Sequence, residues 1–432
     1  MSRLDRLLSA SRIAASATAT QNDLVRELRQ GDGASWAQIA AAVGMTRGAA
    51  QSKFSRLLAA DRLPRPSKPQ SPPRVLEYAG VQIPTSPERP TILKGDSVKV
   101  LRSIDDNTFD AIVTDPPFEL GFTRISGRKW DATGIAFSTQ LWGEALRVLK
   151  PGGNLLAFGS PRTYHRLVVA VEDSGFEVRD TILAWVKSTG FAKSLDISRL
   201  LESREESALA VAWAGTGTGL KPAHEPIVVA RKRPDGSIVD NIIRHGVGGL
   251  NIDAARVLTE DDRSRTPGQS RVGDVINFQR GGTAKSRSHP GGRWPANVVV
   301  VHRPDCTLEG ECAPDCAAAE LDAQSAGAAR FFPAFRYQGR ASASERPRVD
   351  GVAHLTVKPI GLMEWLVGLA ALPGQLILDP FAGSGATTEA AMHLGVRSIG
   401  IDNQTDHVRQ IQQRIGRAQG TAAITPHPHR TH

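Results

Sequence analysis

Short apolar segments alternate with amphipathic segments in two parts of this chain, residues 91–186 and 350–418. In Phe109–Thr114, adjacent β-branched residues follow one another without polar alternation, which is typical of a strand buried on both faces of a parallel sheet. Amphipathic segments such as Ser97–Ile104 carry apolar residues at helical spacing. Strands and helices that alternate at this spacing predict an α/β fold with a doubly wound, mostly parallel sheet.

The strand at Phe109–Thr114 runs directly into the tetrad Asp115-Pro116-Pro117-Phe118. Both prolines lack a backbone donor and have a fixed φ, and a residue before proline is held in an extended conformation. The tetrad therefore predicts a rigid tip at the carboxyl end of a strand, where open α/β sheets bind ligands. This tip offers a carboxylate, unclaimed carbonyl groups and an aromatic face. An Asp-Pro-Pro triplet alone is more often a plain turn, so other parts of the chain must decide its role.

A glycine-containing segment, Asp379–Gly385, lies between a predicted strand and a predicted helix. Gly383 and Gly385 allow a tight turn and a close approach of the backbone to a ligand. Asp402 follows Gly383 by nineteen residues at the end of the next strand, the spacing at which an acidic residue reaches ribose hydroxyls. The segment lacks the third glycine of a dinucleotide site and the Lys-Ser/Thr of a phosphate-binding loop. A nucleoside cofactor without phosphates, such as S-adenosylmethionine, therefore suits it better than NAD or ATP.

Asp115–Phe118 and Phe381–Gly385 together resemble the motif pair of the DNA amino-methyltransferases, which methylate adenine N6 or cytosine N4. Their order along the chain is similar to that of the beta group of these enzymes, in which the Rossmann-like methyltransferase fold is circularly permuted. The resemblance covers about residues 91–418. Smaller segments agree with the family at Lys94–Asp96, at Lys150–Gly153, which predicts a turn that ends a helix, and at Lys358-Pro359. Lys221–Glu225 and Gly292–Asn297 are similar to segments of phage and prophage DNA methylases.

The resemblance implies a role for each residue of the two motifs. The catalytic residues would be Asp115, Pro116, Pro117 and Phe118, and the cofactor-binding residues Asp96, Lys358, Asp379, Phe381, Gly383, Ser384, Gly385 and Asp402. Asp115 and the Pro116 carbonyl would accept the N–H groups of the target amine, while Phe118 stacks on a base flipped out of double-stranded DNA. The expected reaction is methyl transfer from S-adenosylmethionine to adenine N6.

Two alternatives to this reaction stay open at the level of the sequence. Many cytosine-N4 enzymes of the family carry Ser at the head of the tetrad, so Asp115 favours adenine. Phe118, however, replaces the commoner Tyr, and cytosine N4 therefore remains an alternative. The other alternative is a DNA-binding regulator on a catalytically degenerate methyltransferase scaffold, against which the intact Asp115, Gly383 and Gly385 argue.

Residues 1–60 predict a separate helical unit ahead of the methyltransferase. A helix, a turn at Gly44 and a second helix over Arg47–Leu58 resemble the helix-turn-helix of bacterial regulators. The expected DNA contacts on the second helix are Arg47, Gln51, Lys53 and Arg56. A net charge of +9 favours a polyanionic partner, although a helical hairpin without DNA contact is the alternative. The proline-rich residues 61–90 predict an extended linker.

The strand–helix pattern breaks down between residues 187 and 349, which separate a catalytic half, 91–186, from a cofactor-binding half, 350–418. Glycine runs and basic residues indicate an insertion that recognises the target sequence. We expect this insertion to contain strands at Pro226–Ala230 and Asn297–Val301, to have its own irregular structure otherwise, and to lie outside the main sheet. Its base contacts follow no linear code, and no pattern here encodes dimerisation or a companion restriction enzyme. Residues 419–432 predict a disordered tail.

The three cysteines lie close to a histidine, in the order His302, Cys306, Cys312 and Cys316. Four such side chains could hold a tetrahedral zinc ion, but their spacing matches no standard zinc knuckle. Cysteine also occurs as a small buried apolar residue, so the sequence leaves both interpretations open and we assign no metal from it. None of the three follows a proline, which disfavours cytosine-C5 chemistry. A count of three cysteines is consistent with a reducing cytoplasm, as expected for a bacterial or phage-encoded enzyme. No apolar run is long enough to span a membrane.

Overall fold

The structure is a computed structural model that describes residues 76–420 with gaps, the longest at 122–130, 188–193 and 260–288. The chain divides into two compact units, Met1–Arg74 and Val75–His432, and the described residues all belong to the second. The predicted helix-turn-helix unit and most of the predicted tail therefore lie outside the described residues. Within the described part, no helix combines the length and apolarity that a membrane crossing requires.

A single ten-stranded sheet forms the centre of the second unit, in the order β10-β9-β7-β8-β5-β4-β13-β14-β3 with β6 beside β8. The strands are β3 (Thr91–Lys94), β4 (Phe109–Thr114), β5 (Leu149–Phe158), β6 (Glu177–Val178), β7 (Leu183–Val186), β8 (His224–Arg231), β9 (Val298–His302), β10 (Ala334–Arg336), β13 (Leu376–Asp379) and β14 (Arg397–Asp402). All neighbours pair in parallel except β8, which is antiparallel to β5, β6 and β7. The predicted α/β class with a mostly parallel sheet is confirmed.

Strands from the two ends of this unit lie next to each other at the centre of the sheet. β13 and β14 insert between β4 and β3, so that the sheet joins two halves that are far apart in the sequence. β13 pairs with β4 in the register Ile377↔Ala111 and Leu378↔Ile112. Because parallel strands end at the same edge, the segments that follow β4 and β13 meet there.

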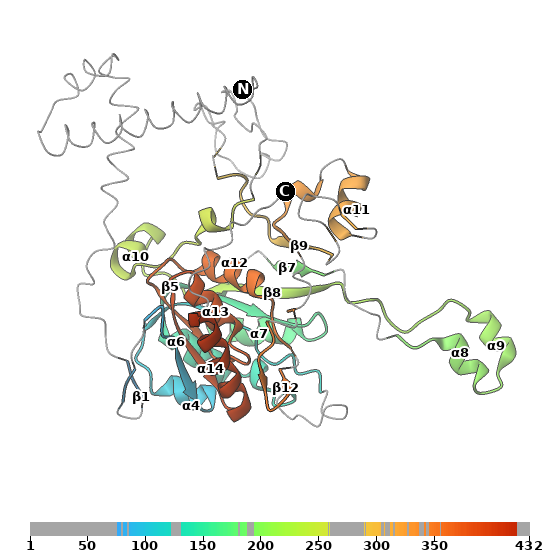
Figure 1. Ribbon diagram of the computed structural model, residues 1–432, viewed down its shortest axis with the longest axis horizontal. Helices are drawn as coiled ribbons and strands as arrows, with labels where there is room; N and C mark the ends of the chain where they lie inside the picture. The colour runs from blue at the N-terminus through green and yellow to red at the C-terminus, as the bar shows by residue number, and fades with distance from the viewer. Residues whose placement is uncertain are drawn as a thin grey trace, which may run out of the picture. The chain divides into compact units, whose positions relative to one another are not determined.

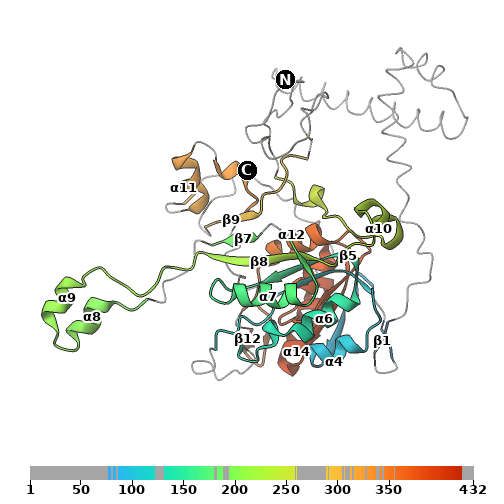
Figure 2. The same cartoon turned by 180° about the vertical axis from the view of Figure 1, so that it is seen from behind.

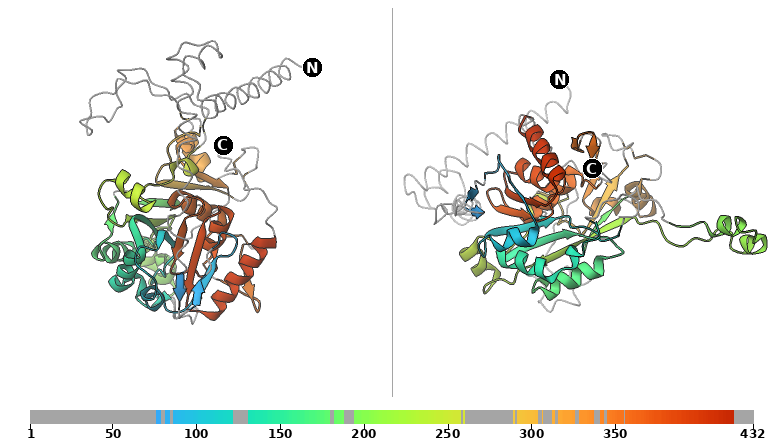
Figure 3. Two further views of the ribbon diagram at one scale, coloured as in Figure 1. Left: turned by 90° about the vertical axis from the view of Figure 1, so that its left-hand side faces the viewer. Right: turned by 90° about the horizontal axis from the view of Figure 1, so that it is seen from below.

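Helices cover both faces of the sheet, as a doubly wound fold requires. One face carries α4 (Ser97–Arg102), α6 (Thr139–Val148) and α7 (Tyr164–Asp173), and the other carries α12 (Ile360–Ala370) and α13 (Ala386–His393), against which α14 (Thr405–Gly420) packs. Figure 1 is seen from the side of α12 and α13, Figure 2 from the side of α6 and α7, and the left panel of Figure 3 shows the sheet between the two layers. Each helix layer encloses a hydrophobic core against its face of the sheet.

Local sequence explains where the helices around the site begin. The Asp96 side chain caps α4 by accepting a hydrogen bond from the Lys99 amide at 3.1 Å. Gly385 caps α13 with φ +81°, a left-handed conformation that glycine adopts without strain. α6 buries Leu141, Trp142, Ala145 and Val148, an apolar stripe at helical spacing. The Gly385 and Asp96 caps place both helix starts at the edge where β3, β4 and β13 end.

The prediction that residues 187–349 lie outside the main sheet is wrong. β8, β9 and β10 all come from this region, and Ile227–Ala230 of β8 is buried at the centre of the sheet. The sequence predicts the strands at Pro226–Ala230 and Asn297–Val301 but not their place in the main sheet, because β8 runs antiparallel and so departs from the strand–helix order of a parallel sheet. The region also contains α8 (Ile197–Glu202), α9 (Ser207–Ala212), α10 (Ile238–His245), η4 (Ile252–Ala255), α11 (Ala317–Gln324), η5 (Ala328–Phe331) and β11 (Arg348–Val349), which pairs with β12 (Val352–Ala353).

Two smaller predictions also need correction. The predicted extended linker at 61–90 contains an antiparallel hairpin of β1 (Leu76–Tyr78) and β2 (Val81–Ile83). The segment Lys150–Gly153, a motif that suggests a turn after a helix, lies inside β5, although α6 does end just before it at Val148. Gly152 has φ +77°, so the strand passes through a left-handed residue at this point.

Candidate active site

A cavity of about 500 Å³ opens at the edge where β4, β13 and β14 end. This volume lies within the range of small-molecule sites. The predicted site residues that line it are Asp96, Asp115, Pro116, Pro117, Phe118, Lys358, Asp379, Phe381, Gly383, Ser384 and Asp402. Gly385 lies just beyond the lining as the cap of α13. The predicted DNA contacts Arg47, Gln51, Lys53 and Arg56 lie outside the described residues.

The two oxygens of Asp115 are in different environments. Oδ2 accepts a hydrogen bond from Lys358 Nζ at 2.7 Å. Oδ1 is screened from solvent and has no donor among the described residues. The carbonyl of Pro116, beside it, likewise accepts no hydrogen bond from the described part of the chain. An unsatisfied buried acceptor costs about 1–3 kcal/mol, so a ligand that supplied N–H donors here would remove that cost.

Lys358 belongs to a buried network of alternating charges. Its ammonium lies 2.7 Å from Asp115 Oδ2 and 3.5 Å from Glu225 Oε2, and Lys187 contacts the other oxygen of Glu225. Lys358 Nζ also lies 5.0 Å from the centre of the Phe118 ring and 4.6 Å from that of Phe158. The Lys358 ammonium therefore lies next to both the Asp115 carboxylate and the Phe118 ring of the tetrad.

Burial and neighbouring charges shift the pKa values of this network in opposite directions. Burial raises the pKa of Asp115, and Lys358 opposes that rise. Burial alone would lower the pKa of Lys358, but Asp115 and Glu225 outweigh it and hold the pKa above its ordinary value. Burial would raise the pKa of Glu225, but Lys358 and Lys187 outweigh it and lower the pKa. Each buried charge therefore depends on its partner to stay ionised.

The segment that follows the tetrad is fixed by a second carboxylate. The backbone amides of Glu119 and Leu120 donate to Asp131 at 2.9 and 3.2 Å, and the Thr163 hydroxyl donates to the Phe118 carbonyl at 2.8 Å. Glu119 adopts φ +56°, which is uncommon for a residue other than glycine. Burial raises the pKa of Asp131. These contacts hold the tetrad as a preformed tip.

The glycine segment after β13 is organised by two acidic residues. Asp379 Oδ1 accepts hydrogen bonds from the Thr114 hydroxyl at 2.7 Å and the Phe381 amide at 3.1 Å, which ties the ends of β13 and β4 together. Asp402 accepts a hydrogen bond from the Gly383 amide at 2.9 Å. A Cβ atom at Gly385 would lie 3.0 Å from Ile411 in α14, so a larger residue would push these helices apart.

Sequence reasoning missed several residues of this site. Glu225 and Lys187 complete the charge network, and Asp131 anchors the tip. His354 and His407 also line the cavity, with their rings 4.4 Å apart and His407 Nδ1 3.1 Å from Asp402. Only Glu225 lies in a segment with a sequence signal, Lys221–Glu225, and that signal gives it no role. A sequence offers no direct signal for the other contacts, because no motif marks the residues that make them.

The chain matches a known protein family over most of its length. The DNA methylase family, defined for N6 and N4 amino-methyltransferases, matches residues 109–413, most of the chain. The chain belongs to this family. The match begins at β4, ahead of the tetrad, and extends into α14, so it includes both the tetrad and the glycine segment. The chain is therefore a DNA amino-methyltransferase of the N6/N4 class, and family membership does not choose between the two bases.

Individual members of the family are only distantly similar to this methylase. Type II methyltransferase M.HindIII of Haemophilus influenzae is 24% identical over 364 residues, covering 75% of this chain and 94% of that protein. Type II methyltransferase M.HpaI of Haemophilus parainfluenzae is 21% identical over 328 residues, covering 75% and 73%. Among solved structures, a DNA modification methylase from Thermus thermophilus aligns with TM-score 0.40 and 17% identity, over 76% of this chain and 96% of that one.

Proposed function

We propose that this methylase transfers a methyl group from S-adenosylmethionine to the N6 amine of an adenine flipped out of duplex DNA. The observation that carries the proposal is the screened Oδ1 of Asp115 beside the carbonyl of Pro116, two acceptors to which no described residue donates. Two acceptors at the end of one strand match the two N–H groups of an exocyclic amine. A base can reach them only after it leaves the DNA stack.

The charges that line the cavity support S-adenosylmethionine as the cofactor. The described lining residues include five carboxylates and one lysine, namely Asp96, Asp115, Asp131, Asp379, Asp402 and Lys358. Such a surface repels phosphates and favours a cofactor that carries positive charge. When bound, S-adenosylmethionine supplies an electrophilic methyl group on a sulfonium. We assign Asp96 and Asp402 to its adenosine part, and Asp379 and Phe381, with the backbone of Gly383, to its methionine part.

The tetrad would prepare the amine for attack by holding its hydrogens. The lone pair of an exocyclic amine is conjugated with the base ring, which makes the nitrogen a poor nucleophile. Hydrogen bonds from the amine to Asp115 Oδ1 and the Pro116 carbonyl favour a tetrahedral nitrogen whose lone pair points away from the ring. Lys358 occupies Oδ2 and so leaves Oδ1 to the substrate. Asp115 acts in this scheme as an orienting acceptor, and Phe118 supplies a face on which the base stacks. S-adenosylhomocysteine is the leaving group, and the methylated nitrogen releases one proton to solvent.

The choice of adenine rests on the carboxylate at the head of the tetrad. The contact with Lys358 favours the carboxylate form of Asp115, and a charged acceptor forms a stronger hydrogen bond than a serine hydroxyl. Many cytosine-N4 enzymes of the family have Ser at this place. Cytosine N4 is the second candidate, because its amine presents the same two N–H groups to the same acceptors.

Nucleoside analysis distinguishes the two bases. We expect the full-length protein, incubated with methyl-labelled S-adenosylmethionine and unmethylated bacterial genomic DNA, to place label in N6-methyladenine. Label in N4-methylcytosine would overturn the choice of base and keep the reaction class. The absence of label on genomic DNAs of widely different composition would favour the regulator with a degenerate scaffold.

Cofactor affinity should depend on pH through Asp379. Burial raises the pKa of Asp379 to about 6, although hydrogen bonds from Thr387 and Thr114 oppose the rise. A cationic ligand binds the ionised form more tightly, so affinity should fall as pH drops through about 6, by at most about tenfold per pH unit for one linked proton. Calorimetric titration with S-adenosylmethionine between about pH 5 and 8 measures this dependence.

The variant Asp379→Asn provides the control for that titration. It keeps the size of the side chain and an acceptor for Thr114, but it cannot ionise. We expect weaker binding at neutral pH and a dissociation constant that no longer changes across pH 6. A wild-type dissociation constant that is equal on both sides of pH 6 would show that Asp379 does not face the positive charge of the cofactor.

A further inference from the structure

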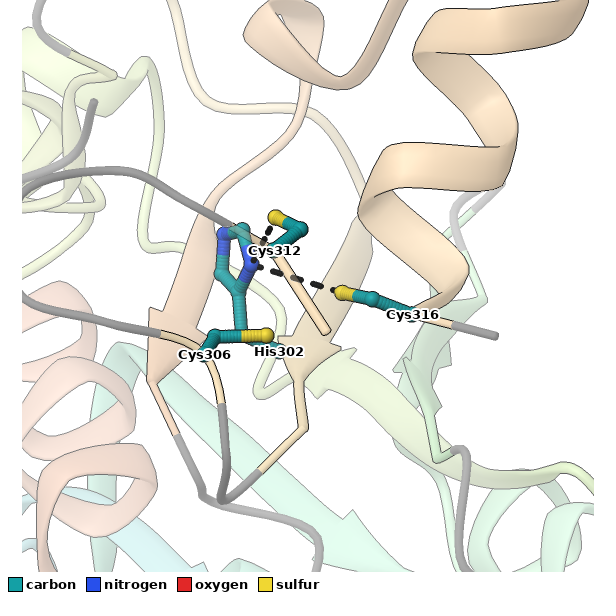
Figure 4. A group of neighbouring side chains, drawn as sticks. All are labelled: His302, Cys306, Cys312 and Cys316. Atoms are coloured by element: carbon teal, nitrogen blue, oxygen red, sulfur yellow. Dashed lines mark hydrogen bonds between the residues drawn. The ribbon is translucent and has the colours of Figure 1, made fainter. Parts of the chain in front are cut away.

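Four potential metal ligands converge away from the active site, in the region between the two halves of the methyltransferase. His302 is the last residue of β9, Cys306 and Cys312 lie in the segment that follows, and Cys316 stands at the N-cap position of α11, where its side chain makes no capping hydrogen bond. One ligand atom from each residue lies within 4.8 Å of all the others. Figure 4 shows the imidazole and the three thiols turned toward a common point.

The distances within this cluster match a tetrahedral metal site. His302 Nδ1 lies 3.4 Å from Cys312 Sγ and 3.5 Å from Cys316 Sγ. Zinc bonds of about 2.3 Å to sulfur and 2.05 Å to nitrogen, at tetrahedral angles, place a nitrogen and a sulfur about 3.6 Å apart. The observed separations therefore leave space for one zinc ion at the centre of the four ligand atoms.

We propose that His302, Cys306, Cys312 and Cys316 bind one structural zinc ion. Four protein ligands fill a tetrahedral shell, which leaves no open position for a substrate and assigns the ion a structural role. The surroundings suit thiolates, because the Ala313 amide points at Cys306 Sγ at 3.4 Å and the N-terminus of α11 begins at Cys316.

The alternative to a metal site is that the cysteines serve only as small apolar residues. The hydrophobic cluster around them is small, because its fully buried members among the described residues are Val300, Cys316 and Ala318, with partly buried residues packed against them. β9 is held in the main sheet through Val299 and Val301, so it is α11 and the cysteine segment that so small a core leaves with little stability of their own. Small structural units of this kind are commonly held together by a metal ion or disulfides.

The ion would connect the main sheet to the region that we propose for target recognition. β9 pairs in parallel with β7 on one side and with β10 on the other. A zinc ion at His302 would fasten the end of β9 to the start of α11 and so fix the outer edge of the sheet. This inference does not depend on which base is methylated or on whether the enzyme is active.

Metal analysis of the full-length protein tests the proposal. We expect wild type, purified without chelators and under reducing conditions, to contain one zinc ion per chain. Replacement of the zinc by cobalt should give the visible absorption of a tetrahedral site together with a thiolate charge-transfer band. Cys312→Ser and Cys316→Ser should lower zinc affinity at least about 100-fold, since even residues that only support a ligand contribute 10- to 100-fold.

A histidine far from the cluster provides the matched control. His165 is exposed on α7, and His165→Ala should keep the full zinc content. Chelation of wild type should also accelerate proteolysis between β9 and β10, a result that does not require any variant to fold. A wild-type protein that neither contains zinc nor takes it up from a zinc-buffered solution would overturn the proposal, as would full zinc retention in a soluble Cys316→Ser variant.

Discussion

Replacing Asp115 by Asn should lower the rate of methyl transfer about 100-fold or more, because a hydrogen bond to a charged acceptor contributes about 1.5–3 kcal/mol and its loss also disturbs the position of the amine. The affinity for S-adenosylmethionine should change much less than the rate. The expected pattern is therefore a protein that binds the cofactor and DNA but turns over slowly, measured by single-turnover transfer of labelled methyl groups.

Asparagine is the informative substitution because it keeps the shape of the side chain but replaces one acceptor oxygen by an amide group that donates hydrogen bonds. Lys358 Nζ needs an acceptor at 2.7 Å, so the amide oxygen of Asn should take the place of Oδ2. The amide nitrogen then occupies the place of Oδ1, where it presents hydrogens to the hydrogens of the target amine. Asp115→Asn should consequently be at least as slow as Asp115→Ala, although it is the smaller change.

An exposed aspartate supplies the control for this experiment. Asp173 lies at the end of α7 on the surface, and Asp173→Asn should leave both rate and affinity unchanged. If Asp115→Asn kept more than about a tenth of the wild-type rate, the hydrogen bond to Oδ1 would be worth less than about 1.4 kcal/mol and the orienting role would be untenable.

The sequence was sufficient to predict the parts of the site that depend on local patterns. The rigid tip after β4 and the turn after β13 follow from prolines and glycines, and their proximity follows from a parallel sheet. Contacts between distant segments had no such signal. Lys358 lies 243 residues after Asp115, and the only local indication of its role was a Lys-Pro pair before a helix.

The same difference explains the errors in the region 187–349. The place of a parallel strand in the sheet can be predicted because a crossover helix connects it to the next strand. β8 pairs antiparallel with β5, so this rule does not apply to it. Glu225 of β8 is carried into the charge network by that pairing. The sequence therefore predicts β8 as a strand but not its place beside β5, and that place is what brings Glu225 to the site.

Removal of Lys358 should destabilise the fold and not only the reaction. Breaking a buried ion pair by removing one partner costs about 3–5 kcal/mol, and the Lys358 side chain is only 8% exposed. Lys358→Met keeps a long unbranched side chain but removes the ammonium group that lies next to the rings of Phe118 and Phe158. Glu225 retains Lys187, so Asp115 is the group left without a counter-charge. Chemical denaturation should show a free energy of unfolding lowered by about this amount.

A double variant separates this explanation from a simple loss of packing. In Lys358→Met with Asp115→Asn no unpaired charge remains, so much of the lost stability should return while methyl transfer stays impaired. Lys150→Met is the matched control. Its partner Asp110 would still accept a hydrogen bond from the Leu376 amide at 2.7 Å, and the Lys150 side chain is 29% exposed. That variant should lose less stability and remain active.

The pH dependence of the Lys358→Met variant provides an independent test. Without Lys358 the effect of burial is opposed only by the weaker charge effect of Lys187, so the pKa of Asp115 in the folded state should rise further above its ordinary value of 3.8. An acid whose folded pKa is raised costs stability as pH increases from the unfolded value through the folded one, and the cost disappears at lower pH. The stability difference between Lys358→Met and wild type should therefore be largest at neutral pH and shrink in acid. A difference that stays constant with pH, or a double variant no more stable than the single one, would mean that Lys358 contributes packing rather than the charge that holds Asp115 in place.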